Sequence, residues 1–213
     1  QALRLEDPKG PVSWTVGGGT LRLFFPTNAP GEPPSWASPT NVYETLSLIS
    51  KDAQGNPTAL LLKSKNGDAA AFTSFGSTAV LRISQLTDRN GNTLDYQRDP
   101  GGRLSRVSDV YGRFTTLGYG GSGLVTGLTD QAGRTVSYAY DGLGRKSSEA
   151  GFEGTTGYQY DAANRMTRIT YPNGSLKLFE YDQKGRITKE EGDGGANRMS
   201  YAYHASSTVM TDA

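Results

Sequence analysis

The stretch Tyr140-Asp141-Gly142-Leu143-Gly144-Arg145 decides the fold, because the chain repeats it in a fixed register. A second copy begins at Tyr160, 20 residues further on, and a third begins at Tyr181, after another 21 residues. Looser copies begin at Tyr96, Tyr119 and Tyr203. A recurring unit of this length is one supersecondary element that stacks on its neighbours, so the sequence predicts a repeat protein.

Each copy contains a four-residue pattern, Asp-x-x-Gly, that is typical of a type I β-turn. The aspartate accepts hydrogen bonds from the backbone just downstream, and the glycine takes the left-handed conformation that other residues resist. Asn164 replaces the glycine in one copy, and asparagine is the next best residue there. The pattern begins at Asp7, Asp52, Asp88, Asp99, Asp109, Asp130, Asp141 and Asp182. The structural turn residues of the three best copies are therefore Asp141, Gly144, Asp161, Asn164, Asp182 and Gly185.

A further reversal is expected between the second and third copies. Asn173-Gly174 is the strongest two-residue hairpin signal. If it is the loop, Ile169 pairs with Leu178 on one face, and Met166 pairs with Tyr181 on the other. The sequence therefore predicts a sheet with apolar groups on both faces.

The turns set the fold class. A hairpin of two strands of about six residues is marginal alone and must stack on its neighbours. Long sheets twist and curl as they grow. Glycine or proline interrupts nearly every stretch of a dozen residues, and no window shows a helical apolar stripe. We predict an all-β fold with essentially no helix, in which successive antiparallel hairpins form a wrapped or spiral β-sheet.

The two parts of the chain differ in regularity, with a soft boundary near residue 85. Residues 1–85 are predicted to be an irregular leading β segment, and residues 86–213 the hairpin array. In the first part, strands at 12–16 and 21–25 flank the Gly17-Gly18-Gly19 turn. Five prolines make residues 26–39 a Pro-rich loop that can be neither strand core nor helix. Further strands are predicted at 43–49, 58–63 and 70–75.

Composition argues against most enzyme classes. The chain has no cysteine and one histidine, His204, which is predicted to be a polar residue on a terminal strand. Its 22 basic and 21 acidic residues leave a net charge of +1, which gives no electrostatic case for nucleic acid or membrane partners. No apolar run could span a bilayer, and residues 1–10 lack a signal-peptide pattern. We expect no membrane insertion, and any secretion signal would lie outside this fragment.

Three motifs suggest chemistry but have simpler explanations. Gly118-x-Gly120-x-x-Gly123 matches a dinucleotide fingerprint, yet a strand rather than a helix is expected after it, so we predict a hairpin loop and no cofactor. Residues 88–92 lack the spacing of a calcium loop. The aspartates of the three copies could be glycosidase carboxylates, but each begins a turn. We therefore predict no catalytic, cofactor-binding or metal-binding residues.

The three copies Tyr140–Arg145, Tyr160–Arg165 and Tyr181–Arg186 resemble the YD-repeat (Rhs) family. The resemblance covers residues 88–203 well and the earlier part loosely. It implies large secreted or surface-exposed proteins whose repeats form a spiral β-sheet shell. In bacterial members the shell often encloses a C-terminal toxin, and some animal members are adhesion receptors. The resemblance also implies carbohydrate binding.

Repeated tyrosine and arginine residues are the candidate site. Ring and guanidinium should stack in ladders across the sheet, either stabilising the repeat lattice or presenting aromatic rows to sugars. Trp14 and Trp36 would be additional platforms, although packing against the leading segment is the simpler expectation for both. The candidate carbohydrate-binding or lattice residues are Tyr140, Arg145, Tyr160, Arg165, Tyr181 and Arg186.

The leading hypothesis is a non-enzymatic scaffold, part of a secreted or surface β-shell that encloses or presents another domain such as a toxin. The alternative is an extracellular carbohydrate-binding adhesion module, and the third hypothesis is a glycan-cleaving enzyme. No polar cap is evident near either end of the sequence, so the expected partners are the remainder of a longer parent chain or copies of the same chain, joined through open sheet edges.

Overall fold

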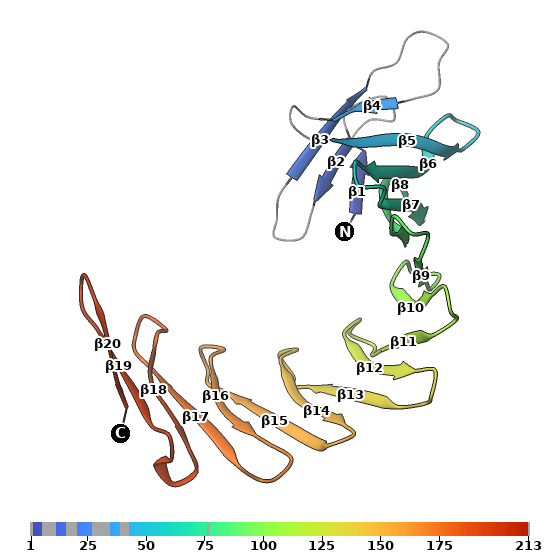
Figure 1. Ribbon diagram of the computed structural model, residues 1–213. Coiled ribbons are helices and arrows are strands. Elements are labelled where there is room, and N and C mark those ends of the chain that lie inside the picture. Colours follow the sequence, from blue (N-terminus) through green and yellow to red (C-terminus); the bar gives the residue numbers. More distant parts are fainter. Residues whose placement is uncertain are drawn as a thin grey trace. The chain divides into compact units, whose positions relative to one another are not determined.

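The computed structural model describes residues 2–5, 12–15, 21–26, 35–38, 43–75 and 77–212. Within these residues, nearly everything is strand or turn, and the helical content is one 3₁₀ turn, Asp193–Gly195. The chain divides into two compact units, residues 1–116 and 117–213. The prediction of an all-β fold built from successive antiparallel hairpins is confirmed (Figure 1).

The first unit begins with eight strands that close into a ring. They are β1 (Ala2–Leu5), β2 (Val12–Thr15), β3 (Leu21–Pro26), β4 (Ser35–Ala37), β5 (Glu44–Lys51), β6 (Pro57–Ser64), β7 (Ala69–Phe75) and β8 (Ser77–Thr87). Each strand pairs antiparallel with the next, and β8 pairs in turn with β1. The end of β8 also pairs with β9 (Thr93–Arg98), and β10 (Leu104–Asp109) and β11 (Phe114–Tyr119) follow. The ring is thus a small antiparallel barrel from which the hairpin array starts.

The barrel has an apolar core to which all strands from β2 to β8 contribute. It consists of Val12, Phe24, Trp36, Leu46, Leu60, Leu62, Ala70, Phe72, Leu81 and Ile83. In β6 and β7, buried and less buried positions alternate, as expected when one face of a strand points into a barrel. Every buried residue in the described part of the chain lies between Val12 and Ile83. We therefore keep residue 85 as the proposed boundary between two modes of packing.

Two predictions for the leading segment need comment. The Pro-rich loop 26–39 was predicted to contain no strand core, but Pro26 ends β3 and pairs with Trp36 in β4. Residues 35–37 contain no proline, and the buried Trp36 ring anchors them in the core. The turns predicted at Asp7 and at Gly17-Gly18-Gly19 lie outside the described residues, as do residues 27–34.

The second unit is a succession of hairpins without a closed core. After β11 come β12 (Val125–Asp130), β13 (Thr135–Tyr140), β14 (Lys146–Gly151), β15 (Gly154–Tyr160), β16 (Met166–Thr170), β17 (Leu176–Tyr181), β18 (Ile187–Gly192), β19 (Met199–Tyr203) and β20 (Thr208–Asp212). Each strand from β12 onward pairs antiparallel with the next. His204 lies in the turn between β19 and β20 rather than on a strand. Among the described strands, β20 pairs with β19 alone.

The turns follow the predicted chemistry. At Asp141, the carbonyl accepts a hydrogen bond from the Gly144 N–H at 2.9 Å, and the Asp141 N–H donates to the Arg145 carbonyl at 2.9 Å. The Asp141 Oδ1 accepts the N–H groups of Leu143 and Arg145. Gly144 has φ +77°, and Asn164 has φ +63° at the equivalent position. All the predicted Asp turns within the described residues close in this way.

The predicted register at Asn173-Gly174 is wrong by one residue. The turn is Tyr171-Pro172-Asn173-Gly174, with the Gly174 N–H donating to the Tyr171 carbonyl, and Ile169 therefore pairs with Lys177. Both favoured two-residue loops, types I′ and II′, require positive φ at the first central residue, which would be Asn173, but of the two only Gly174 has positive φ, at +82°. The fixed φ of Pro172 suits the second position of a type I turn, so this reversal joins the same class as the Asp turns.

The turn geometry predicts a difference between two glycines of one turn. Val at position 144 would be strained by about 1–3 kcal/mol, because a β-branched residue resists positive φ. Gly142 has no positive φ, and an added Cβ there meets no atom within 4 Å. We expect Gly144→Val to lower the free energy of unfolding in urea and Gly142→Val to change it little. Equal effects at the two positions would contradict the turn assignment.

Candidate functional site

The predicted tyrosine and arginine residues lie at one turn of each consecutive hairpin in the second unit. Tyr140, Tyr160 and Tyr181 are the last residues of β13, β15 and β17. Each arginine follows its turn, just before the next strand begins. A β-bulge lies beside each tyrosine, where the register shifts by one residue. Bulges re-aim the neighbouring side chains, so the local backbone sets the direction of the arginines.

Within each copy, the arginine binds the aspartate of its own turn. The Nε to Oδ2 distances are 2.7 Å for Arg145–Asp141, 2.7 Å for Arg165–Asp161 and 2.8 Å for Arg186–Asp182. The backbone and side-chain N–H groups of Arg165 hold the pKa of Asp161 below its usual value, because they favour the ionised carboxylate. These carboxylates are thus engaged in closing turns.

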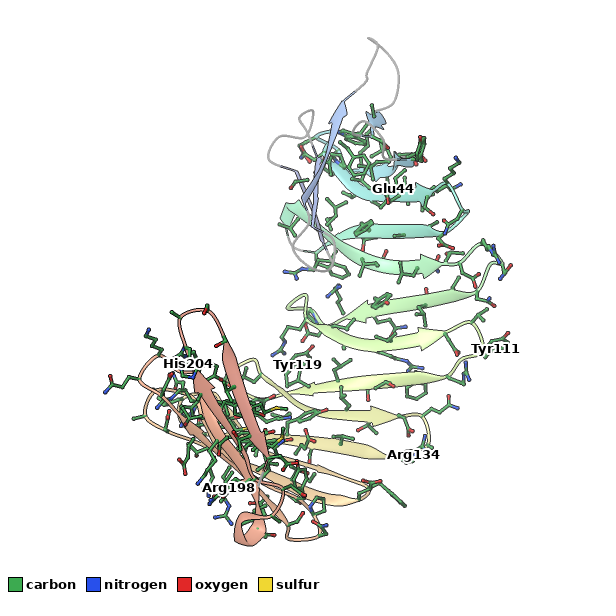
Figure 2. The ribbon with its side chains drawn as sticks, turned by 60° about the vertical axis from the view of Figure 1, so that its left-hand side comes forward. Glu44, Tyr111, Tyr119, Arg134, Arg198 and His204 are labelled. Atoms are coloured by element: carbon green, nitrogen blue, oxygen red, sulfur yellow. The ribbon has the colours of Figure 1, made fainter. Side chains whose placement is uncertain are left out.

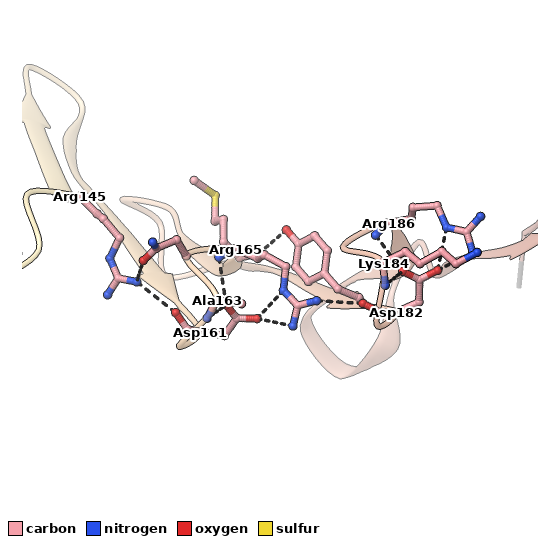
Figure 3. Close-up of polar contacts among 10 residues, drawn as sticks. Arg145, Asp161, Ala163, Arg165, Asp182, Lys184 and Arg186 are labelled. Atoms are coloured by element: carbon pink, nitrogen blue, oxygen red, sulfur yellow. Dashed lines mark hydrogen bonds and ion pairs between the residues drawn. The ribbon is translucent and has the colours of Figure 1, made fainter.

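Two of these arginines, Arg145 and Arg165, also reach the turn of the next copy. Arg145 donates through Nη1 to the Asp161 carbonyl and to the Asn164 Oδ1, both at 3.0 Å (Figure 3). Arg165 donates in the same way to the Asp182 carbonyl at 2.9 Å. One guanidinium therefore ties its own turn to the following turn.

Each arginine also stacks on the tyrosine of the next copy rather than on its own. The guanidinium carbon lies 4.8 Å from the ring centroid for Arg145 and Tyr160, 4.9 Å for Arg165 and Tyr181, and 4.1 Å for Arg186 and Tyr203. Such contacts contribute about 0.5–1 kcal/mol each when exposed. The ladder thus runs across copies and includes Tyr203 of the loose sixth copy.

The tyrosine hydroxyls link each hairpin to the one before it, whereas the arginines link it to the one after it. Each donates to a backbone carbonyl of the preceding hairpin. The distances are 2.7 Å for Tyr140 to Val125, 2.8 Å for Tyr160 to Lys146, 2.6 Å for Tyr181 to Met166 and 2.7 Å for Tyr203 to Ile187. In Tyr160, Tyr181 and Tyr203, a ring face and the hydroxyl are therefore both engaged within the protein.

Two clusters on the tyrosine-bearing face were not predicted. Lys146 forms an ion pair with Glu149 at 2.6 Å and lies 4.5 Å from the Tyr158 ring centroid. Its hydrogen bond to Glu149 lowers the pKa of that carboxyl. Similarly, Glu190 contacts Lys177 and the Tyr201 hydroxyl, each at 3.1 Å. The sequence offers no signal for these clusters, because the pairing that joins them depends on the bulges.

The remaining motifs have structural explanations. Gly120–Gly123 is a hairpin turn followed by β12, as predicted, because the Gly123 N–H donates to the Gly120 carbonyl. The Asp88 carboxylate accepts the N–H groups of Asn90 and Asn92, as in the other turns. In the described part of the chain, no group of three or more acidic or histidine side chains could hold a metal ion. Nor does any described helix have the length and hydrophobicity to cross a membrane.

The hydroxyl contacts predict a contrast between two tyrosines. Tyr160→Phe removes the hydrogen bond to the Lys146 carbonyl and should lower the free energy of unfolding by about 0.5–1.5 kcal/mol. Tyr171 is the matched control, because no described residue receives a hydrogen bond from its 39% exposed side chain. Tyr171→Phe should change stability by less than about 0.5 kcal/mol. Urea denaturation measures both, and a neutral Tyr160→Phe would refute the link.

Comparison with known proteins gives matches over different parts of the chain. A family model described as RHS Repeat matches residues 119–156 and 150–176. Mouse (Mus musculus) Teneurin-3 is 34% identical over 110 residues, which cover 50% of this chain and 4% of Teneurin-3. The chain thus spans a small part of this relative.

Solved structures extend the similarity to most of the chain. The crystal structure of TcdB2-TccC3-Cdc42 has a TM-score of 0.51 at 17% identity and covers 92% of this chain and 11% of that chain. TcdB2-TccC3 has a TM-score of 0.50 at 16% identity, with 91% and 11% covered. At these identities the likeness concerns the fold. The repeated unit and the matched family model agree that residues 119–176 are RHS (YD) repeats, and the solved structures share the fold over most of the chain.

Proposed function

We propose that this chain is a non-enzymatic segment of a secreted or surface YD-repeat shell that encloses or presents another domain, such as a toxin. The observation that carries the proposal is the use of the repeated side chains. The aspartates close turns, the arginines join successive turns, and the tyrosines bond to the preceding hairpin. The most strongly repeated residues therefore hold neighbouring hairpins together. Contacts of this kind are the ones that the wall of a shell needs.

The adhesion alternative finds less support in the ladder. A sugar ring that stacks on an aromatic side chain needs a free ring face. Arginine lies over Tyr160 and Tyr181, and their hydroxyls are bonded to backbone carbonyls. A sugar that stacks on the face covered by arginine would have to displace the guanidinium first. The glycosidase reading is weaker for a similar reason, because each candidate aspartate binds the arginine of its own turn.

A longer parent chain fits the way the sheet ends. Among the described strands, β20 has one partner, so the backbone groups on its other side are available for pairing. A following hairpin of the same protein, or a second copy of this chain, would satisfy them. The fold resemblance covers 11% of the TcdB2-TccC3-Cdc42 chain, which suits a segment of a larger wall.

The scaffold role is tested by removing the contacts between successive hairpins in the parent protein. Replacing both Arg145 and Arg165 by Gln removes the links between successive turns, so an enclosed domain should become sensitive to a protease that the unmodified protein resists. Arg134→Gln is the matched control. Arg134 binds Asp130 of its own turn, has a 78% exposed side chain, and forms no hydrogen bond, ion pair or ring contact with another turn among those the structure describes. Limited proteolysis followed by mass spectrometry measures the difference.

Two other outcomes would replace the scaffold proposal. Saturable binding on a glycan array that is lost in the Tyr160→Ala, Tyr181→Ala double variant, with an unchanged far-ultraviolet circular dichroism spectrum, would favour adhesion. Glycan turnover abolished by Asp141→Asn alone would favour catalysis. The scaffold proposal predicts neither result.

A further inference from the structure

One turn of the array departs from the others in its two central residues. Asp109-Val110-Tyr111-Gly112 has a β-branched and an aromatic residue at its tip, and the structure leaves Val110 51% and Tyr111 76% exposed. The other Asp turns of the described chain have at most one large apolar residue there. Their central pairs are Ala53-Gln54, Arg89-Asn90, Pro100-Gly101, Gln131-Ala132, Gly142-Leu143, Ala162-Ala163 and Gln183-Lys184. The Arg113 guanidinium carbon lies 5.6 Å from the Tyr111 ring centroid, but neither turn chemistry nor burial explains why both central residues are large and apolar.

The exposed pair lines a pocket of about 590 Å³ in the first unit. Figure 2 shows Tyr111 at the turn end of the strands. Leu86 pairs with Leu94 across β8 and β9, and Leu94 pairs with Asp109 of β10, so these residues form one cross-strand row. Ala69 adds to the apolar wall. The volume is within the range of small-ligand sites, about 300–1,000 Å³.

The charges around this pocket are unbalanced. Three aspartates line the pocket. Asp109 forms an ion pair with Arg113 at 2.6 Å, whereas Asp68 and Asp88 form no ion pair with a described side chain. Asp68 accepts hydrogen bonds from the Arg89 backbone N–H and the Asn66 amide. Asp88 accepts its hydrogen bonds from the backbone and amide of the Asn90 to Asn92 segment. These donors are neutral, so the pocket keeps two carboxylate charges that no described cationic side chain pairs with.

We propose that this turn-edge pocket, defined by Asp68, Leu86, Asp88, Leu94 and Tyr111, binds an arginine side chain of a peptide or protein partner. The two carboxylates attract the guanidinium and the leucines contact its aliphatic stem. The Tyr111 ring, over which the Arg113 guanidinium carbon already lies at 5.6 Å from the centroid, is an aromatic surface on which a second guanidinium can stack. A planar cation with an apolar stem matches all three features. A neutral ligand would leave the negative charges uncompensated.

The test follows ¹⁵N-labelled full chain by NMR during titration with N-acetyl-arginine amide. We expect saturable shifts at the amides of Ala69, Leu94 and Tyr111. N-acetyl-citrulline amide has the same shape without the charge and should bind at least about fivefold more weakly, since fivefold corresponds to about 1 kcal/mol. Asp68→Asn keeps an oxygen for the Arg89 N–H but removes one charge, and should weaken binding of the arginine probe.

Aromatic stacking is tested with a pair of equivalent positions. Tyr111→Ser should weaken binding of the arginine probe about two- to fivefold, as expected for an exposed cation–π contact. Leu143→Ser changes the same position of another turn, with a 73% exposed side chain outside the pocket, and should have no effect. Equal binding of the citrulline probe, shifts with methyl α-glucoside but not with arginine, or no shifts at these amides would each overturn the proposal.

Discussion

Reversal of the chain at the Asp turns depends on one backbone constraint, a residue in the left-handed region at the fourth position of the turn. Gly144, Asn164 and Gly185 meet it in the three best copies, with φ of +77°, +63° and +79°. The first residue of the turn then closes it with two backbone hydrogen bonds and a carboxylate. The arginine and tyrosine contacts become available only after this closure, because the bulge beside each turn directs them.

The two parts of the chain reach stability by different means. The barrel of β1 to β8 buries aromatic and aliphatic side chains in one core, as an ordinary globular domain does. In the second unit no described residue is buried, and half-buried side chains join each hairpin to the next. Neighbour-to-neighbour links of this kind are additive along a repeat array, so such a sheet can lengthen without a larger core. That property suits the proposed shell wall. It also explains why tyrosine, aspartate and arginine recur at equivalent positions of successive hairpins.

The local features were readable from the sequence, whereas the non-local ones were not. Asp-x-x-Gly carries its own stereochemistry, so the turns, the strands between them and the absence of a helical pattern could be predicted. The closure of the barrel pairs Leu3 with Leu81, and no periodic signal links residues so far apart.

The error at Asn173-Gly174 arose because Pro172 favours a different turn from the one that the dipeptide suggests alone. The stacking of Arg145 on Tyr160 rather than Tyr140 depends on a bulge, which changes the register by a single residue. Similarly, Val110 and Tyr111 were visible in the sequence, but the pocket beside them exists only because three turns meet.

Amide hydrogen exchange within a single turn tests the central claim most directly. The Asp161 N–H donates to the Arg165 carbonyl at 2.9 Å and the Asp182 N–H donates to the Arg186 carbonyl at 2.9 Å. The N–H groups of Ala162 and Gln183, one residue further on, have no acceptor among the described residues. NMR should therefore show slow exchange at Asp161 and Asp182 and fast exchange at Ala162 and Gln183. Equally fast exchange at all four amides would contradict the account, because the turns on which the sheet depends would not be closed in solution.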